Sequence, residues 1–265
     1  MIVEWNHHLF SSDTETYPFH PDATYEPDPT RRHEDPLSKY HRRLDEVGID
    51  RAVLVQPEPY GDDHSLILDC VYEDPERFRA TSLFYPRDPQ APEKLENLVD
   101  EHGDVVIATR FHSTDSYLDS FADDGVRALW ETASDLGLVV ELHLNPGYAD
   151  GVVQRVEEFP ETPVVIDHLA EPHTGDPIEY GDVLALAEYD NVYMKLSALD
   201  HFSDDGPLYE SVRPFTRWVV DAFGAERMLW GKGDPRIVDV HLPEYGEAER
   251  EQVKGDNAYE LVWDE

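Results

Sequence analysis

The chain has 265 residues, of which 40% are hydrophobic, and its 58 acidic residues against 21 basic ones give a formal net charge of −37. The apolar content argues against a disordered acidic chain, and the charge disfavours nucleic-acid binding, which depends on phosphate neutralisation by Lys and Arg. No run approaches the roughly 20 apolar residues of a membrane-spanning helix, and the start of the chain lacks a secretory signal pattern. We therefore expect a cytoplasmic protein without membrane contact.

The acidic surplus is spread along the whole chain. So many uncompensated charges repel one another and destabilise a compact fold, whereas at about 1 M salt the screening length falls to roughly 3 Å. The composition therefore predicts a halophilic protein. The alternative is a surface that binds a basic partner.

Short and nearly continuous apolar runs recur along the chain. They cover residues 2–5, 52–56, 79–84, 105–111, 138–144, 163–168, 191–197 and 227–231. Continuous runs are typical of strands that are buried on both faces. We therefore expect eight strands.

Stretches with apolar residues at three- and four-residue spacing lie between these runs and predict helices. The main ones are residues 36–49, 91–103, 123–137 and 207–224, and each carries a glycine at or near its end, where helices favour this residue. Residues 65–78 read as a further helix, on which the single cysteine, Cys70, is expected to be a buried thiol.

Strand and helix units in this number predict a single-domain (β/α)₈ TIM barrel over residues 1–265. An open doubly wound sheet is the alternative, but no glycine-rich phosphate loop follows the first strand. Residues 11–35 contain four prolines and little periodicity. A connector of this length predicts a lid or substrate loop, or else a simple surface excursion.

Polar side chains follow several of the predicted strands, at the end where barrel enzymes carry their chemistry. They are Asn6, His7 and His8 on the first; Gln56, Glu58 and Tyr60 on the second; Arg110 and His112 on the fourth; His143 on the fifth; Asp167 and His168 on the sixth; Lys195 and Ser197 on the seventh; Lys232 and Asp234 on the eighth. Because these strand ends converge, we expect one active site there.

Strand alternation predicts which of these side chains face that site. Asn6 and His8 should point into the barrel mouth, with Glu4 on the same side one layer deeper, while His7 faces the helices. Asp167 should point away from His168, and we expect it to be structural.

Eight segments in order resemble the amidohydrolase-related family, and most closely its lactonase-like branch of pyrone-dicarboxylate and sugar lactonases. They are IVEWNHHLF (2–10), VQPEPYGDDHSLILD (55–69), ATRFH (108–112), ELHLNP (141–146), VVIDHLAEP (164–172), NVYMKLSAL (191–199), AFGAERMLWGKGDP (222–235) and GDNAYEL (255–261). The resemblance covers nearly the whole chain and implies a TIM-barrel hydrolase.

Two departures from the family pattern fall at sensitive positions. The first histidine of the strand-1 His-x-His motif is Asn6, and the strand-8 aspartate is Gly233, with Asp234 one residue later. In the wider superfamily these positions and the strand-5 histidine hold a divalent metal. The resemblance therefore leaves two expectations: no required metal, or one zinc ion held by His8, His143 and Asp234, with Gly233 allowing the bend.

Roles follow from the chemistry of lactone opening, which needs a polarised carbonyl, an activated water and a stabilised oxyanion. We expect Asp234 to be the general base, with His8, His143 and His168 as further catalytic residues, since imidazoles titrate near neutral pH. Arg110 should bind a substrate carboxylate, unless it pairs with Glu4 or Asp167 inside the barrel. The other expected substrate contacts are Asn6, Tyr60, His64 and Lys195, although Lys195 would reach solvent in the alternative view.

The expected function is therefore hydrolysis of a lactone of an anionic or polyhydroxy small molecule. A metal-dependent decarboxylase or amide hydrolase of the same superfamily is one alternative. A degenerate barrel that binds a ligand without turning it over is another. The sequence does not determine the oligomeric state, and a homo-oligomer is one of the states it allows.

Overall fold

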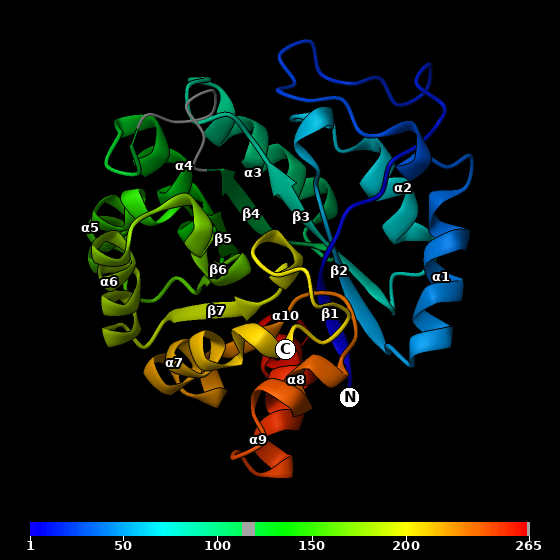
Figure 1. The fold of residues 1–265 in the computed structure, drawn as a ribbon. Coiled ribbons are helices and arrows are strands. Elements are labelled where there is room, and N and C mark those ends of the chain that lie inside the picture. Colours follow the sequence, from blue (N-terminus) through cyan, green and yellow to red (C-terminus); the bar gives the residue numbers. More distant parts are fainter. Residues whose placement is uncertain (113–119, 264–265) are drawn as a thin grey trace.

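Eight parallel strands form one sheet in the order β1 to β8 in the computed structural model, which describes residues 1–112 and 120–263. The strands are β1 Val3–His7, β2 Arg51–Val55, β3 Phe78–Leu83, β4 Val106–His112, β5 Val139–His143, β6 Val164–Ile166, β7 Val192–Leu196 and β8 Met228–Trp230. Each overlaps one of the eight predicted runs. Because β8 returns to the side of β1, the sheet is a nearly closed TIM barrel, as predicted (Figure 1).

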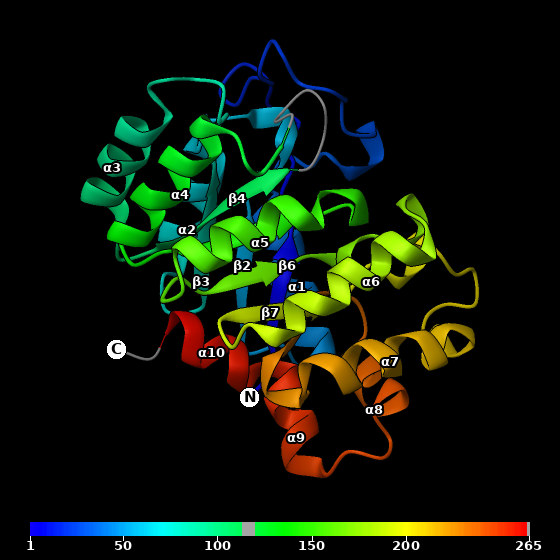
Figure 2. The ribbon, with the colours of Figure 1, turned by 90° about the vertical axis from the view of Figure 1, so that its left-hand side faces the viewer.

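Helices surround the strands on the outside, as the side view shows (Figure 2). They are α1 Pro36–Val47, α2 Ser65–Glu73, α3 Ala91–His102, α4 Asp124–Asp135, α5 Ala149–Glu158, α6 Pro177–Ala185, α7 Arg213–Phe223, α8 Arg236–His241, α9 Glu247–Glu251 and α10 Asn257–Val262. The helix predicted over 207–224 begins only at Arg213, because Tyr209 has a left-handed φ of 51° that interrupts a right-handed helix. Cys70 is buried on α2, and burial raises the pKa of its thiol to about 12.

The interior of the barrel is layered by strand alternation. Side chains at two-residue steps share one face of a strand, and on β5 this face carries Val139, Glu141 and His143. The register of β4 against β5 places Arg110 opposite Glu141 and His112 opposite His143. The barrel therefore has an apolar layer below, a layer of charges in the middle and a layer of histidines at the carboxyl ends.

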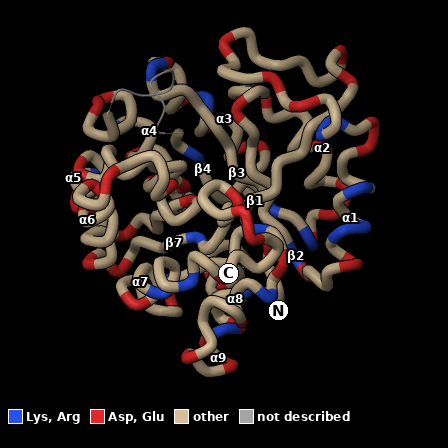
Figure 3. The backbone as a smooth tube through the Cα atoms, in the orientation of Figure 1, with Lys and Arg blue, Asp and Glu red and all other residues tan. Residues whose placement is uncertain are grey.

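Acidic residues occur along most of the outer helices and loops (Figure 3). The segment 11–35 runs outside the strands beside α1 and α2, and it returns to the barrel through a bridge between Ser11 and His33. Within residues 1–112 and 120–263, no helix combines the length and the apolar composition needed to cross a bilayer.

Candidate active site

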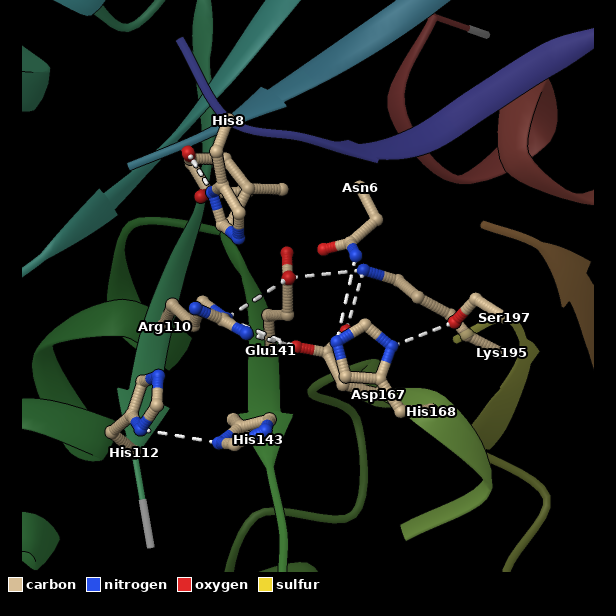
Figure 4. A network of polar contacts seen from close by, with 12 residues as sticks. Asn6, His8, Arg110, His112, Glu141, His143, Asp167, His168, Lys195 and Ser197 are labelled. Carbon is tan, nitrogen blue, oxygen red and sulfur yellow. Dashed lines mark hydrogen bonds and ion pairs between the residues drawn. The ribbon is translucent and has the colours of Figure 1, made fainter. Parts of the chain in front are cut away.

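A cavity of about 450 Å³ opens at the carboxyl ends of the strands. Its lining includes Asn6, His8, Arg110, His112, His143, His168, His201 and Lys232. A larger hollow of about 650 Å³ adjoins it and shares Arg43, Lys232 and Gly233 with it. Of these two hollows only the smaller is lined by histidines, so we place the chemistry there (Figure 4).

Four buried charged residues form the floor of this cavity. This charge cluster consists of Arg110, Glu141, Asp167 and Lys195, each with a side chain at most 3% exposed. The Lys195 ammonium lies 2.9 Å from Oε1 of Glu141 and 2.8 Å from Oδ1 of Asp167, so it forms an ion pair with both carboxylates. Burial would raise the pKa of Asp167, but Lys195 and Arg110 outweigh it and hold this pKa well below its usual range.

The position of Arg110 favours the structural alternative over the anion-binding role. Its Nε and Nη2 donate to the same Asp167 oxygen at 3.0 and 2.7 Å. Lys195 is likewise enclosed in the charge cluster and does not reach solvent. Both expected substrate cations are thus engaged beneath the cavity, although Arg110 still forms part of its lining.

The first strand departs from simple alternation. A bulge between Trp5 and His7 shifts its register against β2, and Trp5 fills the barrel interior, where it donates to Glu141 at 2.8 Å. Glu4 does not lie below Asn6 as predicted. It turns toward α1, where both of its oxygens accept from Arg43 at 2.7 Å.

Asn6 and His8 line the cavity as predicted, while His7, which was predicted to face the helices, contacts α1 and also forms part of the cavity lining. His7 stacks on Tyr40 of α1 with ring centroids 3.5 Å apart. The Nδ2 atom of Asn6 lies 3.5 Å from Nε2 of His168. His8 lines the cavity with its Nδ1 2.8 Å from the carbonyl oxygen of Val55. Because a carbonyl only accepts, Nδ1 of His8 carries the hydrogen and Nε2 is an acceptor.

A left-handed turn after β6 brings further side chains into the cavity. His168, Leu169, Ala170 and Glu171 have φ values of 56°, 54°, 56° and 45°. Each such residue costs about 1–2 kcal/mol relative to right-handed backbone, and strain of this kind tends to occur at functional sites. Through this turn both Asp167 and His168 contribute to the site, whereas alternation alone predicted that they point apart.

The His168 ring is buried and held on both sides. Its Nδ1 lies 2.8 Å from Oγ of Ser197, and its Nε2 faces Asn6. Since the Asn6 amide nitrogen donates, we assign Nε2 as the unprotonated nitrogen. Burial, opposed in part by Asp167, lowers the pKa of His168 well below its usual value, so the ring is neutral near pH 7.

Glu171 is the principal site residue that the sequence did not predict. Its carboxylate accepts from His143 Nε2 at 3.1 Å and from His201 Nδ1 at 2.9 Å. Burial would raise the pKa of Glu171, but the bonds from the two histidines outweigh it and lower this pKa far below the usual range. Its only sequence signal is its place inside the segment DHLAEP, and His201 lies in a loop without any motif.

Three residues that were predicted for the site lie outside the histidine cavity. Asp234 lines the adjoining hollow and is paired with Arg236, whose hydrogen bonds lower its pKa. Tyr60 accepts from the backbone N–H of Ser11 at 2.9 Å and thereby anchors the start of the 11–35 segment. His64 accepts from the backbone N–H of Leu83 at 3.0 Å, and burial lowers its pKa to about 4.

The metal positions of the wider superfamily do not fit a metal in this chain. Asn6 is a poor zinc ligand, Gly233 offers no side chain, and Asp234 is engaged by Arg236. Across the described residues, only His143, His168 and Glu171 bring three potential ligand atoms within 4.8 Å of one another. His8 and Asp234 do not belong to that group.

Two cations line the cavity from its rim. Arg31, in the 11–35 segment, stacks over Phe10 with its guanidinium carbon 5.0 Å from the ring centroid. Lys232, after β8, has its Nζ 3.9 Å from the carboxylate of Asp200, and its side chain is 34% exposed. Tyr25 from the same segment as Arg31 also contributes to the lining.

Residues 3–262 match the protein family described as Amidohydrolase. The chain is 27% identical to the 4-sulfomuconolactone hydrolase of Hydrogenophaga intermedia over 231 residues, which are 85% of this chain and 74% of that protein. It is 28% identical to the L-fucono-1,5-lactonase of Burkholderia ambifaria over 214 residues, covering 75% and 70% of the two chains.

Solved structures with the same fold include a candidate 2-pyrone-4,6-dicarboxylic acid hydrolase from Pseudomonas putida, with a TM-score of 0.78, 22% identity and coverage of 100% and 98% of the two chains. An amidohydrolase from Burkholderia multivorans with bound zinc has a TM-score of 0.78 at 15% identity and covers 99% of both chains. At these identities the likeness concerns the fold.

Proposed function

The chain belongs to the amidohydrolase family, and we propose that within it the protein hydrolyses the ring C–O ester bond of a lactone. The observation that carries this proposal is the cavity at the strand ends, where the imidazoles of His8, His143 and His168 converge opposite the cations Arg31 and Lys232. The two relatives named as lactone hydrolases support the same reaction.

His168 is the proposed general base. Its unprotonated Nε2 faces the cavity, and the contact between Nδ1 and Ser197 fixes the ring. In the proposed step, Nε2 accepts a proton from a water whose oxygen attacks the lactone carbonyl carbon. The ring C–O bond then breaks, the leaving oxygen takes the proton from His168, and the product is a hydroxy acid with one water added.

Other residues take supporting roles in this proposal. Glu171 holds His143 at the cavity wall, and the acceptor Nε2 of His8 is available to a substrate hydroxyl. Asn6 offers its amide to the substrate. Asp234, which was the expected base, is replaced by His168 in this role because the structure pairs Asp234 with Arg236 away from the histidines.

An anionic or polyhydroxy substrate is proposed from the rim of the cavity. Arg31 and Lys232 provide positive charge in a chain with a net charge of −37, and cations bind a carboxylate or sulfonate through charge-assisted hydrogen bonds. These two residues replace Arg110 and Lys195, which are engaged in the charge cluster. Because Arg31 and Tyr25 line the cavity, residues 11–35 are proposed to act as a substrate loop.

We also propose that the protein works in a salt-rich cytoplasm. The net charge of −37 and the single cysteine are consistent with a reducing, salt-rich cytoplasm. The same charge supports a small-molecule enzyme without nucleic-acid partners.

The test is a panel of lactones assayed in molar KCl. It contains neutral sugar lactones, lactones that bear a carboxylate, and pyrone dicarboxylates, together with an amide and a β-keto acid. Turnover of at least one lactone with release of a hydroxy acid is the expected result. Turnover of the amide or the β-keto acid alone would assign another reaction of the superfamily, and binding without any turnover would indicate a degenerate barrel.

A further inference from the structure

We propose that this chain holds a divalent metal of the zinc type at a displaced site, with His143, His168 and Glu171 as ligands and His201 hydrogen-bonded to Glu171 beside them. These four residues are called the histidine–glutamate cluster below. The site lies on the β5–β6 side of the cavity instead of the β1–β8 side that the superfamily uses. It shares the cavity of the proposed function and competes with it for Nε2 of His168, because a nitrogen bound to a metal cannot accept a proton from water.

The spacing of the ligand atoms fits a shared metal. Ligand atoms of His143, His168 and Glu171 lie within 4.8 Å of one another. The distance from His143 Nε2 to Glu171 Oε1 is 3.1 Å, and that from His201 Nδ1 to Glu171 Oε2 is 2.9 Å. Zinc binds nitrogen and oxygen at about 2.0–2.2 Å in tetrahedral geometry, which places neighbouring ligand atoms roughly 3.3 Å apart.

The ligand types suit the same metal. Imidazole and carboxylate together select zinc and similar first-row divalent ions. The side chain of Glu171 is 4% exposed, so its carboxylate is held away from bulk solvent. Two imidazoles and one carboxylate are three protein ligands, which leaves a fourth position of a tetrahedral zinc ion open.

Outer contacts orient the ligands as metal sites require. Ser197 holds Nδ1 of His168, which leaves Nε2 directed at the cluster. His112 lies 3.1 Å from Nδ1 of His143, opposite the Nε2 that faces Glu171. The strained backbone at 168–171 buries Leu169 and Ala170 in the core and brings His168 and Glu171 to the same point.

Asn6 supplies an independent sign of an occupant. Its side chain is 4% exposed and faces His168, and Oδ1 is buried without a hydrogen-bond partner in the described part of the chain. Buried polar atoms are normally satisfied. An unpaired acceptor beside the cluster therefore indicates that a ligand with its own hydrogen-bond donors belongs in this space.

The loss of ligands on one side and their gain on the other are consistent with displacement. Asn6 and Gly233 stand where the family pattern has a histidine and an aspartate, and these changes remove two ligands from the β1–β8 side. Glu171 adds a carboxylate after β6, while His143 is common to both arrangements.

The experiment measures metal binding directly, in the absence of any substrate. The full-length protein, stripped with chelator in molar KCl, is titrated with Co²⁺ and with Zn²⁺. Binding is followed by calorimetry, by the visible absorption of tetrahedral Co²⁺, and by metal analysis after gel filtration. One equivalent of bound metal is expected, and no binding by the wild type would overturn the site.

Variants distinguish the displaced site from the one that the superfamily uses. Glu171→Gln and His201→Asn are expected to weaken Co²⁺ binding at least 10-fold and to change its absorption, while Asp234→Asn binds like the wild type. Circular dichroism verifies that each variant is folded. Unchanged binding by Glu171→Gln, or loss of binding by Asp234→Asn, would refute the assignment.

The lactone panel is evaluated separately from these titrations. Metal binding together with no lactone turnover by the metal-free protein would uphold the site and reject the proposed reaction. Lactone turnover by a protein that binds neither ion would reject the metal site and uphold the proposed reaction.

Discussion

Arg110 on β4 donates through Nε and Nη2 to one oxygen of Asp167, at 3.0 and 2.7 Å, and both side chains are enclosed in the barrel. The pair lies directly beneath the cavity, and Lys195 contacts the other Asp167 oxygen at 2.8 Å. With Glu141, the charge cluster has two positive and two negative members. It therefore forms a buried floor under the histidines, in which formal positive and negative charges are equal in number.

Arg110→Met should be strongly destabilising. The substitution leaves Asp167 and Glu141 with a single cation, and removing one partner of a buried ion pair lowers the free energy of unfolding by about 3–5 kcal/mol. Denaturant unfolding in molar KCl measures this change. Arg236→Met, which breaks an exposed pair with Asp234, is the matched control and should stay close to the wild type. Equal small effects of both substitutions would contradict a structural role for Arg110.

His168→Asn should lower kcat by about 10²–10⁴-fold, the usual contribution of a general base. The measurement is steady-state kinetics on the lactone found in the panel. Asp234→Asn serves as the comparison and should retain most of the activity, because Arg236 occupies that carboxylate. A larger loss in Asp234→Asn than in His168→Asn would return the role of base to the strand-8 loop.

Lys232→Met should affect binding of the substrate more than its turnover. Loss of a hydrogen bond to a charged group costs about 1.5–3 kcal/mol, so KM for a carboxylate-bearing lactone should rise at least about 10-fold. The KM of a neutral lactone should change little. A parallel rise for both substrates, or a fall confined to kcat, would place Lys232 outside anion recognition.

Stability should fall as the pH drops from about 6.5 to 4 because of His64. Burial lowers the pKa of His64 in the folded chain to about 4, while in the unfolded chain it lies near 6.5. The unfolded state therefore binds more protons than the folded state in this range. At pH 4 the titration of His64 has lowered the free energy of unfolding by up to about 3 kcal/mol. His64→Gln can still accept from Leu83 but does not titrate, so it should show a shallower pH slope. An unchanged slope would be the contrary result.

Salt should raise the thermal stability of the wild type. With 58 acidic residues against 21 basic ones, self-repulsion is strong in dilute buffer and is screened in molar KCl. Scanning calorimetry should show a higher Tm and a sharper transition as KCl increases. A Tm that is indifferent to salt between dilute buffer and molar KCl would argue against a halophilic design and leave a basic partner as the explanation of the charge.

The sequence by itself determined the strands, the barrel and the family. Eight apolar runs were sufficient because burial on both faces imposes a local composition on a strand, whatever lies around it. The motif order identified His8, His143 and His168 at the cavity, since strand ends of a barrel converge on one side. Asn6 and Arg110 were likewise located at the site, although the role of Arg110 was left open.

Tertiary structure alone decided how these side chains are paired. A bulge in β1 turns Glu4 toward α1, and a left-handed turn after β6 brings Glu171 to His143 and His201. Asp234 is bound by a neighbour two residues away, a contact that depends on the local loop path. Hydrogen bonds and ion pairs depend on distances between chain-distant atoms and on backbone angles outside the regular regions. Hydrophobic periodicity carries no information about either, so it predicted the barrel and left the chemistry of its cavity to the fold.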